Sequence, residues 1–468
     1  MMKTPAVKDV PVRRLDKDLR GYLETNADIV TVVKKPVSLE DVGALSAQSE
    51  GPIVFENIVE KPGFRLCDML VKHRWSQARA LGVPAADFLR TLAFGLRRPP
   101  RGLVNVKSGP VKEVVLTGKD VDWTRLPVPY HTDKDDAPYV TLMNIVRDPE
   151  TGFYNSSHAR TMCLEPTRGI ASFVTPHTNI IIKKYLEAGL DEMPIAFVTG
   201  VHPAYEIMAN YSGLHMDMWG EMEMVGTIMD QDVEMVPCET IDLTVPAHAE
   251  IVVAGLVNLK ERFREGQSPG PSMYFIPRYQ SQPEVRITAV TMRADRPIYR
   301  NHQSCPETDH QTLPRLCHEA VLYNRLAEMN LRVKDVRFPT WGGAVSCLIQ
   351  FEYPREGFVN DALMMVMGAP WLNTKMVVAV SPDTDIDDPG SVYHAIATRC
   401  DPSRDLFVVG STRGSPYDPS AAPLQDQYPW RVVGKVGIDA TIKPRDDAGD
   451  FERSWPRNWG KVRLEDYL

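Results

Sequence analysis

The stretch VTLMNIVRDPETGFYNSSHAR (residues 140–160) has the pattern of a β-hairpin, with two strand-like runs on either side of a turn. The segment DPETG (148–152) supplies the turn, because Asp and Pro favour turn positions and Gly tolerates the backbone that tight turns need. We therefore predict strands over 140–147 and 153–160. The return strand ends in the polar run NSSHAR (155–160), which places several hydrogen-bonding side chains on a sheet.

Two residues of this polar run, Asn155 and Arg160, lie five positions apart. Because successive side chains of a strand point to opposite faces, an odd offset separates these two unless a bulge intervenes. The amide of Asn155 can share one divalent cation with the imidazole of His177 and the carboxylate of Glu221. Oxygen and imidazole ligands without thiolates suit a hard or borderline ion such as Mn²⁺ or Mg²⁺. A cation beside an arginine suits an anionic cofactor and a carboxylate substrate.

The histidine of this set is expected at the start of a helix. Thr175 is a candidate N-cap, Pro176 fits the first helical position and Gly189 fits the C-terminal stop. His177 then lies in the first turn, where free backbone N–H groups favour anions. Composition alone favours a capping or core role for such a histidine, and Glu223 is a competing carboxylate to Glu221.

The rest of the chain alternates between helix-like and strand-like segments, and RRPPRG (97–102) is a cluster of residues that break regular structure. Beyond residue 313 the alternation is regular, which is typical of βαβ units around a parallel sheet. The expected helices are 16–24, 76–81, 85–96, 313–330, 359–367 and 390–398, and the expected strands are 53–56, 250–257, 285–293, 344–351, 376–381 and 405–409. The acidic run 383–388 lacks the glycine and final glutamate of a calcium loop, so we expect a solvated loop there.

Composition limits the class of protein. A hydrophobic content of 43% and a charged content of 24% over 468 residues are those of a globular protein with two or three domains. The net charge of −8 argues against a nucleic-acid binder. Seven scattered cysteines without a C-x-x-C pair argue against disulfides and thiolate zinc sites. With no signal-peptide pattern and no membrane-spanning apolar run, we expect a cytoplasmic protein that does not bind membranes.

Seven local strings occur in the order found in one enzyme family. They are NSSHAR (155–160), TPH (175–177), VHPAYEIMA (201–209), EMEMVG (221–226), VPAHAEIVVAG (245–255), REG (264–266) and GKVGIDAT (434–441). With them the chain resembles the UbiD-type decarboxylases, which use prenylated flavin mononucleotide (prenylated FMN). No single string is specific, but seven in one order are hard to obtain by chance.

The resemblance implies a multidomain α/β fold with five parts. These are an N-terminal α/β region (1–110), a split β-barrel domain that binds prenylated FMN and metal (111–312), a connecting helix (313–330), a C-terminal α/β oligomerisation domain with a parallel-type sheet (331–430), and a tail that contributes to the cofactor site (431–468). It also implies a homodimer or larger homo-oligomer, and a flavin prenyltransferase as the partner that supplies the cofactor.

The same resemblance assigns ligands residue by residue. The divalent cation, Mn²⁺ or alternatively Mg²⁺ or Fe²⁺, would be held by Asn155, His177 and Glu221. A monovalent cation, K⁺, would lie at or near Ser156, Ala209, Asn210, Ser212 and Glu221. The cofactor would contact Asn155, Ser156, Ser157, His158, Ala159, Arg160, Thr175, Pro176, His177, Glu221 and Lys435. Without the resemblance, Lys435 would be an ordinary loop lysine, since no Walker or dinucleotide glycine motif is present.

For the chemistry, the resemblance implies that Arg160 holds the substrate carboxylate or tunes the flavin, and that Glu265 orients Arg160. On spacing alone, an ordinary surface or core ion pair is the more common role for either residue. The family pattern places a second acid five residues after the first, where this chain has Gly270. Histidine is the natural substitute as proton donor because its pKa lies near neutrality. His310, expected just ahead of the long helix, is the best-placed candidate, ahead of His302.

The predicted function is reversible, non-oxidative decarboxylation of an aromatic, heteroaromatic or α,β-unsaturated carboxylic acid, with prenylated FMN as electron sink. The missing acid favours an aromatic or heteroaromatic substrate. An aroyl-coenzyme A decarboxylase or a carboxylase of the same family is an alternative. A metal-dependent hydrolase built on Asn155, His177 and Glu221 would be colourless and active with metal alone. A non-catalytic flavin-binding subunit would bind flavin without turnover.

Overall fold

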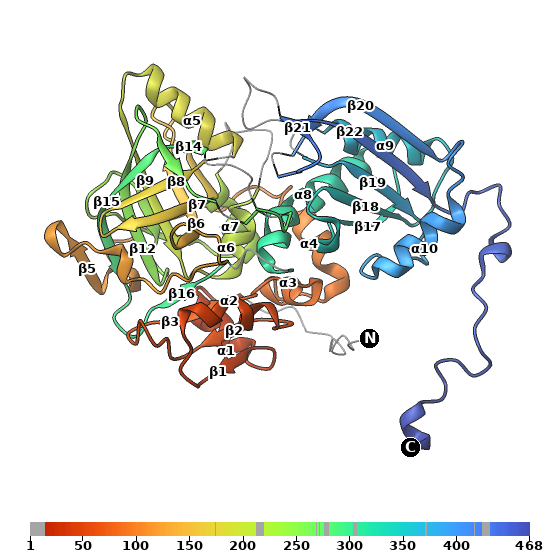
Figure 1. The fold of residues 1–468 in the computed structure, drawn as a ribbon, viewed down its shortest axis with the longest axis horizontal. Helices are drawn as coiled ribbons and strands as arrows, with labels where there is room; N and C mark the ends of the chain where they lie inside the picture. Colours follow the sequence, from red (N-terminus) through yellow and green to blue (C-terminus); the bar gives the residue numbers. More distant parts are fainter. Residues whose placement is uncertain are drawn as a thin grey trace.

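A computed structural model gives the arrangement of the chain in space (Figure 1). It describes residues 15–173, 175–211, 220–267, 269–270, 272–275, 280–302, 307–369, 372–415, 417–423 and 431–468. A β-barrel, a small N-terminal sheet and a C-terminal α/β unit lie side by side, with helix α8 (Asp309–Glu328) between them. In the described part of the chain, no helix combines the length and the apolar character needed to cross a membrane.

The predicted hairpin forms, as strands β6 (Tyr139–Arg147) and β7 (Tyr154–Glu165) paired in one unbroken antiparallel register. Its turn is organised by the side chain of Asp148, which accepts hydrogen bonds from two backbone N–H groups of the turn. Gly152 takes a φ of +75°, in the left-handed region that glycine enters without steric cost. Turn chemistry readable from the sequence therefore sets the register of the strand that carries the polar run.

The hairpin belongs to a closed antiparallel barrel. Around it the strands follow the order β12, β9, β6, β7, β8, β15, and β12 pairs back onto β15. The other barrel strands are β8 (Arg168–Ser172), β9 (Glu192–Thr199), β12 (Ile251–Asn258) and β15 (Glu284–Met292), with β5 (Val114–Thr117) paired to β15. Side chains from alternate positions of these strands, among them Leu142, Phe197 and Val253, form one buried core. Closure removes the open sheet edges that would otherwise expose unpaired backbone groups.

The N-terminal region is completed by a strand from far along the chain. Its sheet has the order β1, β2, β3, β16, and β16 (Ile298–Arg300) pairs in parallel with β3 (Arg65–Asp68). The other elements are α1 (Leu19–Thr25), β1 (Thr31–Val33), α2 (Leu39–Ala47), β2 (Ile53–Phe55), α3 (Arg74–Ala80), α4 (Phe88–Gly95) and β4 (Leu103–Asn105). The predicted separation of residues 1–110 from 111–312 is therefore incomplete, because β3 needs β16 and β4 pairs with β10 (Val233–Pro237).

Helices cover one side of the barrel and connect it to the C-terminal unit. The barrel region also holds α5 (Pro176–Glu187), α6 (Pro203–Met208), α7 (Glu221–Met229), β11 (Thr244–Pro246), β13 (Phe263–Glu265) and β14 (Gln280–Gln282). Helix α8 contacts α4, α6 and β17 (Val333–Arg337), and its apolar side chains belong to a core that continues into the C-terminal sheet. It begins four residues before the predicted start of the connecting helix, because the capping box of Thr308 and Gln311 starts it there.

The C-terminal unit is a mixed sheet with helices on both faces (Figure 1). Its order is β17 (Val333–Arg337), β18 (Ser346–Phe351), β19 (Met376–Val380), β22 (Arg431–Ala440) and β20 (Leu406–Gly414), with β21 (Ala422–Pro423) beside β22. Helices α9 (Phe358–Gly368) and α10 (Pro389–Arg399) alternate with the strands as predicted. Strands β18, β19 and β22 are parallel, whereas β17 and β20 pair antiparallel at the two edges.

Two C-terminal predictions are corrected by this order. The strand expected at 405–409 does not continue the parallel sheet beside β19, because β22 lies between them. The segment GKVGIDAT (434–441), predicted as part of a separate tail, lies almost entirely in β22, an interior strand of the C-terminal sheet between β19 and β20. Lys443, just beyond this strand, is still buried against the sheet, and the end of the chain then extends away from the body of the molecule (Figure 1).

Candidate active site

Strand β7 presents its polar run on two faces, because its pairing with β6 has no bulge. On one face, the amide nitrogen of Asn155 donates to the hydroxyl of Thr178 on α5, 3.2 Å away. On the other face, Arg160 pairs with Glu265 on β13. Asn155 and Arg160 therefore leave opposite faces of the strand, as their odd spacing predicts.

Ser157 shares the face of Asn155 and is held by two neighbours. Its hydroxyl donates to the side-chain oxygen of Asn144 at 3.2 Å, and the Asn144 amide nitrogen donates to the Ser157 carbonyl at 2.8 Å. The hydroxyls of Ser157 and Thr178 are 3.3 Å apart, and Thr175 donates to Thr178 at 2.9 Å. Sequence reasoning missed Asn144 and Thr178. The hairpin register could have found Asn144, since it lies directly opposite Ser157.

Helix α5 brings His177 to the start of this polar group. Thr175 has the extended backbone of an N-cap, Pro176 occupies the first position and Gly189 follows the end with a φ of +72°, as predicted. The Thr175 side chain caps no backbone group and bonds the hydroxyl of Thr178 instead. His177 lies in the first turn, as expected.

His177 and Glu221 face each other from the first turns of α5 and α7. The His177 Nδ1 atom lies 3.9 Å from the Glu221 Oε1 atom, and the backbone N–H of Ser156 donates to Glu221 Oε2 at 2.7 Å. Burial raises the pKa of Glu221, and the contacts with His177 and Ser156 oppose that rise. Glu223 lies on the same helix as the competing carboxylate, and its buried Oε2 atom has no hydrogen-bond partner in the described structure, so the assignment of Glu221 stays a prediction.

Among the described residues, we consider Asn155, His177 and Glu221 as the ligands of a cation. Among the described residues, no three His, Cys, Asp or Glu side chains have the spacing of a metal site. A cation here would therefore need the amide oxygen of Asn155 beside His177 and Glu221, as the sequence predicts. The amide nitrogen already donates to Thr178, which leaves the oxygen for this purpose.

The residues assigned to a monovalent cation are only partly placed together. Ser156 adjoins Glu221 through its backbone, and its own buried hydroxyl has no hydrogen-bond partner in the described structure. Ala209 and Asn210 follow α6, where the Asn210 amide donates to the carbonyl of Glu206 at 2.8 Å. Ser212 lies outside the described residues.

Arg160 and Glu265 form a bidentate ion pair. Arg160 Nε donates to one carboxylate oxygen at 2.6 Å and Nη2 to the other at 2.9 Å. The side chains are 12% and 1% exposed, so both charges are largely removed from water. Two parallel charge-assisted bonds fix the plane of the guanidinium as well as its position. An ordinary surface pair is excluded by this burial.

His310 lies in the first turn of α8 rather than in the loop ahead of it, where the sequence placed it. Burial, together with the positive charges of His131 and Arg160, lowers the pKa of His310 to about 4. His310 thus lies within electrostatic reach of Arg160. Sequence reasoning missed His131, whose Nε2 atom is 3.1 Å from the carbonyl of Tyr139 on β6.

His158 and His302 form a second imidazole pair. Their rings meet edge to face with centroids 5.2 Å apart, and the pKa of His158 is lowered to about 3 by burial. His158 Nδ1 lies 3.1 Å from the Asn210 amide, and its Nε2 has no hydrogen-bond partner among the described residues. Ala159, next in the strand, packs into the barrel core. His302 thus adjoins His158 on the face of β7 that carries Arg160, whereas His310 has its pKa lowered by the charge of Arg160 itself. The better placement of His310 over His302 stays a prediction.

The remaining two predicted positions are Lys435, expected at the cofactor phosphate, and Gly270, where the family pattern has an acid. The ammonium of Lys435 donates to the carbonyl of Met367 on α9 at 2.7 Å, and burial lowers the pKa of Lys435. Its role toward a phosphate remains a prediction. Gly270 donates its N–H to the carbonyl of Tyr274 at 2.9 Å, which is a turn contact. No side chain is available at this position to act as the second acid.

The family of the chain follows from its match to two domain models. The UbiD model, described as the 3-octaprenyl-4-hydroxybenzoate carboxy-lyase Rift-related domain, matches residues 103–305. The model of the carboxy-lyase C-terminal domain matches residues 311–440. The chain belongs to the UbiD family. It is a carboxy-lyase, and the sequence resemblance is confirmed.

Relatives span nearly the whole chain. The curated anhydromevalonate phosphate decarboxylase of Methanosarcina mazei is 31% identical over 447 residues, covering 94% of this chain and 98% of that protein. The Methanothermobacter thermautotrophicus protein of the same name is 31% identical over 450 residues, covering 93% of this chain and 99% of its own length. The UbiD-class enzyme HmfF from Pelotomaculum thermopropionicum, solved in complex with FMN, is similar with a TM-score of 0.86 and 30% identity, covering 96% of this chain and 100% of its own.

Proposed function

We propose that this carboxy-lyase releases CO₂ without net oxidation from an unsaturated, aromatic or heteroaromatic carboxylic acid, with prenylated FMN as its cofactor. The buried bidentate pair of Arg160 and Glu265 carries this proposal, because it holds a guanidinium in a fixed plane on strand β7, the strand that also carries Asn155. Structures of related enzymes support the assignment of prenylated FMN as the cofactor. HmfF was solved with FMN, and an evolved dimeric form of HmfF, 29% identical to this chain over 97% of it, was solved with prenylated FMN at a TM-score of 0.82.

The residues present fit a cation that ties a phosphorylated cofactor to the protein. Ligand atoms lie about 2.1 Å from a cation such as Mg²⁺, so two ligands of one ion are at most about 4.2 Å apart. The 3.9 Å between His177 Nδ1 and Glu221 Oε1 falls within that limit. A cation would also offset the cost of burying the Glu221 carboxylate. Asn155, His177 and Glu221 would hold Mn²⁺ or Mg²⁺, while Lys435 would meet the phosphate.

The reaction requires a cofactor that can accept electrons. Loss of CO₂ from an sp² carbon leaves an electron pair that side chains cannot stabilise, and prenylated FMN, when bound, supplies the electron sink. The chain contributes binding and orientation. The planar guanidinium of Arg160 suits the substrate carboxylate, and Glu265 holds that plane in place.

Protonation of the product carbon needs a group other than a second acid, since Gly270 offers none. His310 is a candidate because it lies near Arg160 and is neutral at physiological pH, as its pKa of about 4 requires. A neutral imidazole can relay a proton, taking it on one nitrogen and giving it from the other.

The relatives suggest the first substrates to test. Anhydromevalonate phosphate, named for two of them, is an unsaturated acid with a phosphate group, and the missing acid at Gly270 favours aromatic or heteroaromatic acids. Both groups satisfy the proposal. We further propose that a flavin prenyltransferase supplies the cofactor and that the chain assembles as a homodimer or larger oligomer, as the dimeric form of HmfF illustrates for a relative.

The test is co-expression with a flavin prenyltransferase, followed by absorbance and mass spectrometry of the purified protein. Carboxylic acids of both groups are then assayed for CO₂ release, and their decarboxylated counterparts are incubated with bicarbonate to detect carboxylation. Bound prenylated FMN with turnover of an acid supports the proposal. A colourless protein that hydrolyses substrates with metal alone would overturn it, and so would a flavin-loaded protein that acts on no acid.

A further inference from the structure

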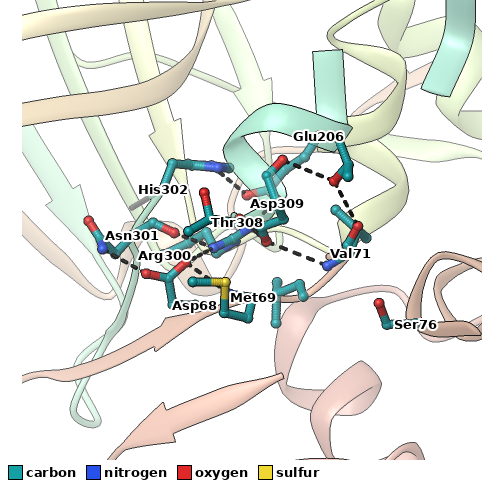
Figure 2. A network of polar contacts seen from close by, with 12 residues as sticks. Asp68, Met69, Val71, Ser76, Glu206, Arg300, Asn301, His302, Thr308 and Asp309 are labelled. Atoms are coloured by element: carbon teal, nitrogen blue, oxygen red, sulfur yellow. Dashed lines mark hydrogen bonds and ion pairs between the residues drawn. The ribbon is translucent and has the colours of Figure 1, made fainter. Parts of the chain in front are cut away.

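Three arginines are buried in the part of the chain that the structure describes, and one of them lacks an acidic partner. Arg300 bonds to the three acids that surround it in Figure 2, which are Asp68, Glu206 and Asp309. Arg399 forms a bidentate pair with Asp383, with bonds of 2.9 and 2.7 Å. Arg315, on α8 and 8% exposed, has no carboxylate partner among the described residues.

The guanidinium of Arg315 is held by one carbonyl and one aromatic ring. Its Nη2 atom donates to the carbonyl of Ala344 at 2.8 Å, and its central carbon lies 5.6 Å from the centroid of the Phe338 ring. The Nε and Nη1 atoms donate to no described group, yet both remain accessible to solvent. The two contacts thus fix the direction of the guanidinium, while most of its N–H groups stay available to a ligand.

These contacts do not explain why the side chain carries a charge. A neutral amide could donate to Ala344 as well, whereas a charge that is buried without a partner is costly. Burial lowers the pKa of Arg315 to about 10, and only Tyr417 and Cys347, neither of them a carboxylate, act against that shift. The guanidinium is still charged at neutral pH, so an anion from outside the chain would stabilise it.

Arg315 lies where the barrel meets the C-terminal unit. Ala344 belongs to the segment between β17 and β18, and Tyr417, within electrostatic reach of Arg315, follows β20. The carbonyl of Tyr417 accepts a hydrogen bond from the hydroxyl of Ser272 at 2.7 Å, and Ser272 lies in the turn that begins at Gly270. In that turn the family pattern places its second acid. Arg315 therefore adjoins the segments at one edge of the candidate site.

Helix α8 relates Arg315 to His310 of the site. The two residues are five positions apart, which is about 7.5 Å along the helix axis and about 140° around it. His310 lies within electrostatic reach of Arg160 on the barrel, whereas Arg315 contacts Ala344 and Phe338 of the C-terminal unit. A substrate that lies between these units with its reacting carboxylate at Arg160 would thus have its other end on the side of Arg315.

We propose that Arg315 binds a second anionic group of the substrate, a phosphate or a carboxylate at the end opposite the group that leaves as CO₂. This inference rests on the proposed decarboxylation and narrows its substrates. Of the acids proposed above, it selects those with two anionic groups, such as a phosphorylated unsaturated acid, over aromatic acids with a single carboxylate. Phosphate and carboxylate oxygens accept the strong, charge-assisted hydrogen bonds that a guanidinium donates.

The first test measures anion binding without any turnover. The thermal midpoint is compared in phosphate and in chloride at equal ionic strength, for the native protein, Arg315→Met and Arg325→Met. Arg325 is the matched control, since it lies on the same helix with a side chain 43% exposed. Phosphate also stabilises proteins by exclusion from their surface, and that effect should be equal in all three. We expect the native protein and the control to gain more from phosphate than Arg315→Met, because only they retain the bound anion.

The inference fails if Arg315→Met gains as much stability from phosphate as the native protein, and that result would leave the proposed decarboxylation untouched. Methionine keeps an extended side chain without the unpaired charge, so we expect the variant to fold. Should it not fold, Arg315→Gln removes the charge and keeps a donor for Ala344, and the same two outcomes apply to it.

The second test separates KM from kcat in protein loaded with prenylated FMN. It compares an acid that carries a second carboxylate with the methyl ester of that second carboxylate. Arg315→Met should raise the KM of the diacid by about 10- to 100-fold, the usual loss when a hydrogen bond to a charged group is removed. It should leave the kcat of the diacid and the KM of the ester unchanged. Inorganic phosphate should compete with the diacid in the native enzyme and not in the variant.

Two results of this second test would overturn the inference. Equal losses on the diacid and on the ester would show that Arg315 is only structural. Phosphate that binds without competing with the diacid would show that the anion is not part of the substrate. Failure of the proposed decarboxylation is seen separately, as a loaded enzyme that releases CO₂ from no acid while Arg315→Met still removes the phosphate effect.

Discussion

Arg160→Ala should abolish turnover, retain much of the bound cofactor and destabilise the fold more than loss of an ordinary arginine. The variant leaves the carboxylate of Glu265, 1% exposed, without its bidentate partner in the core. Breaking a buried ion pair in this way costs about 3–5 kcal/mol, because the remaining charge stays desolvated. Part of this loss of stability comes from the buried Glu265 carboxylate that is left without a partner, and the rest comes from the lost ion pair.

A second variant separates the two contributions. In Arg160→Ala combined with Glu265→Gln, the neutral amide no longer needs a cation, so the double variant should be more stable than the single one by about 1–3 kcal/mol. Arg286→Ala is the control. Its partner Glu192 lies 3.1 Å away with both side chains about half exposed, so the cost should stay within about 1 kcal/mol.

Urea denaturation followed by tryptophan fluorescence measures these differences, and CO₂ release measures turnover. Two results would refute the reasoning. One is an Arg160→Ala protein as stable as Arg286→Ala, which would mean that Glu265 is solvated. The other is an Arg160→Ala enzyme with native turnover, which would remove Arg160 from the substrate site.

Three further predictions concern the cation, the proton donor and acid stability. Glu221→Gln should lower bound metal and cofactor by about tenfold or more, measured by metal analysis and absorbance, whereas Glu223→Gln on the same helix should retain both. His310→Ala should slow solvent-deuterium incorporation into product by about 10²- to 10⁴-fold, and an unchanged rate would eliminate His310 as donor. Burial lowers the pKa values of His202 and His318 to about 3, so their neutral forms stabilise the fold above pH 6.5 and this stability is lost as the pH falls. Each of the two histidines should lower the free energy of unfolding by about 1.4 kcal/mol per pH unit below 6.5. A thermal midpoint that stays constant from pH 7 to pH 5 would contradict this prediction.

Local patterns predicted the parts of the site that neighbouring residues determine. The turn DPETG set the hairpin and therefore the alternation that separates Asn155 from Arg160. The sequence Thr-Pro-His placed His177 in the first turn of α5. These predictions succeeded because turn and cap preferences act over a few residues. Recognition of the family also followed from local strings, since their order along the chain needs no knowledge of contacts.

The sequence by itself thus determined the strand, the helix start and the set of side chains for a cation and a carboxylate. Only the tertiary structure decided what surrounds them. Strand β16 joins the N-terminal sheet from more than two hundred residues away, and β22 enters between β19 and β20. The first of these pairings buries Arg300 among Asp68, Glu206 and Asp309. No local pattern marks such a group of buried ion pairs, because its charges meet only when distant segments pack and exclude water.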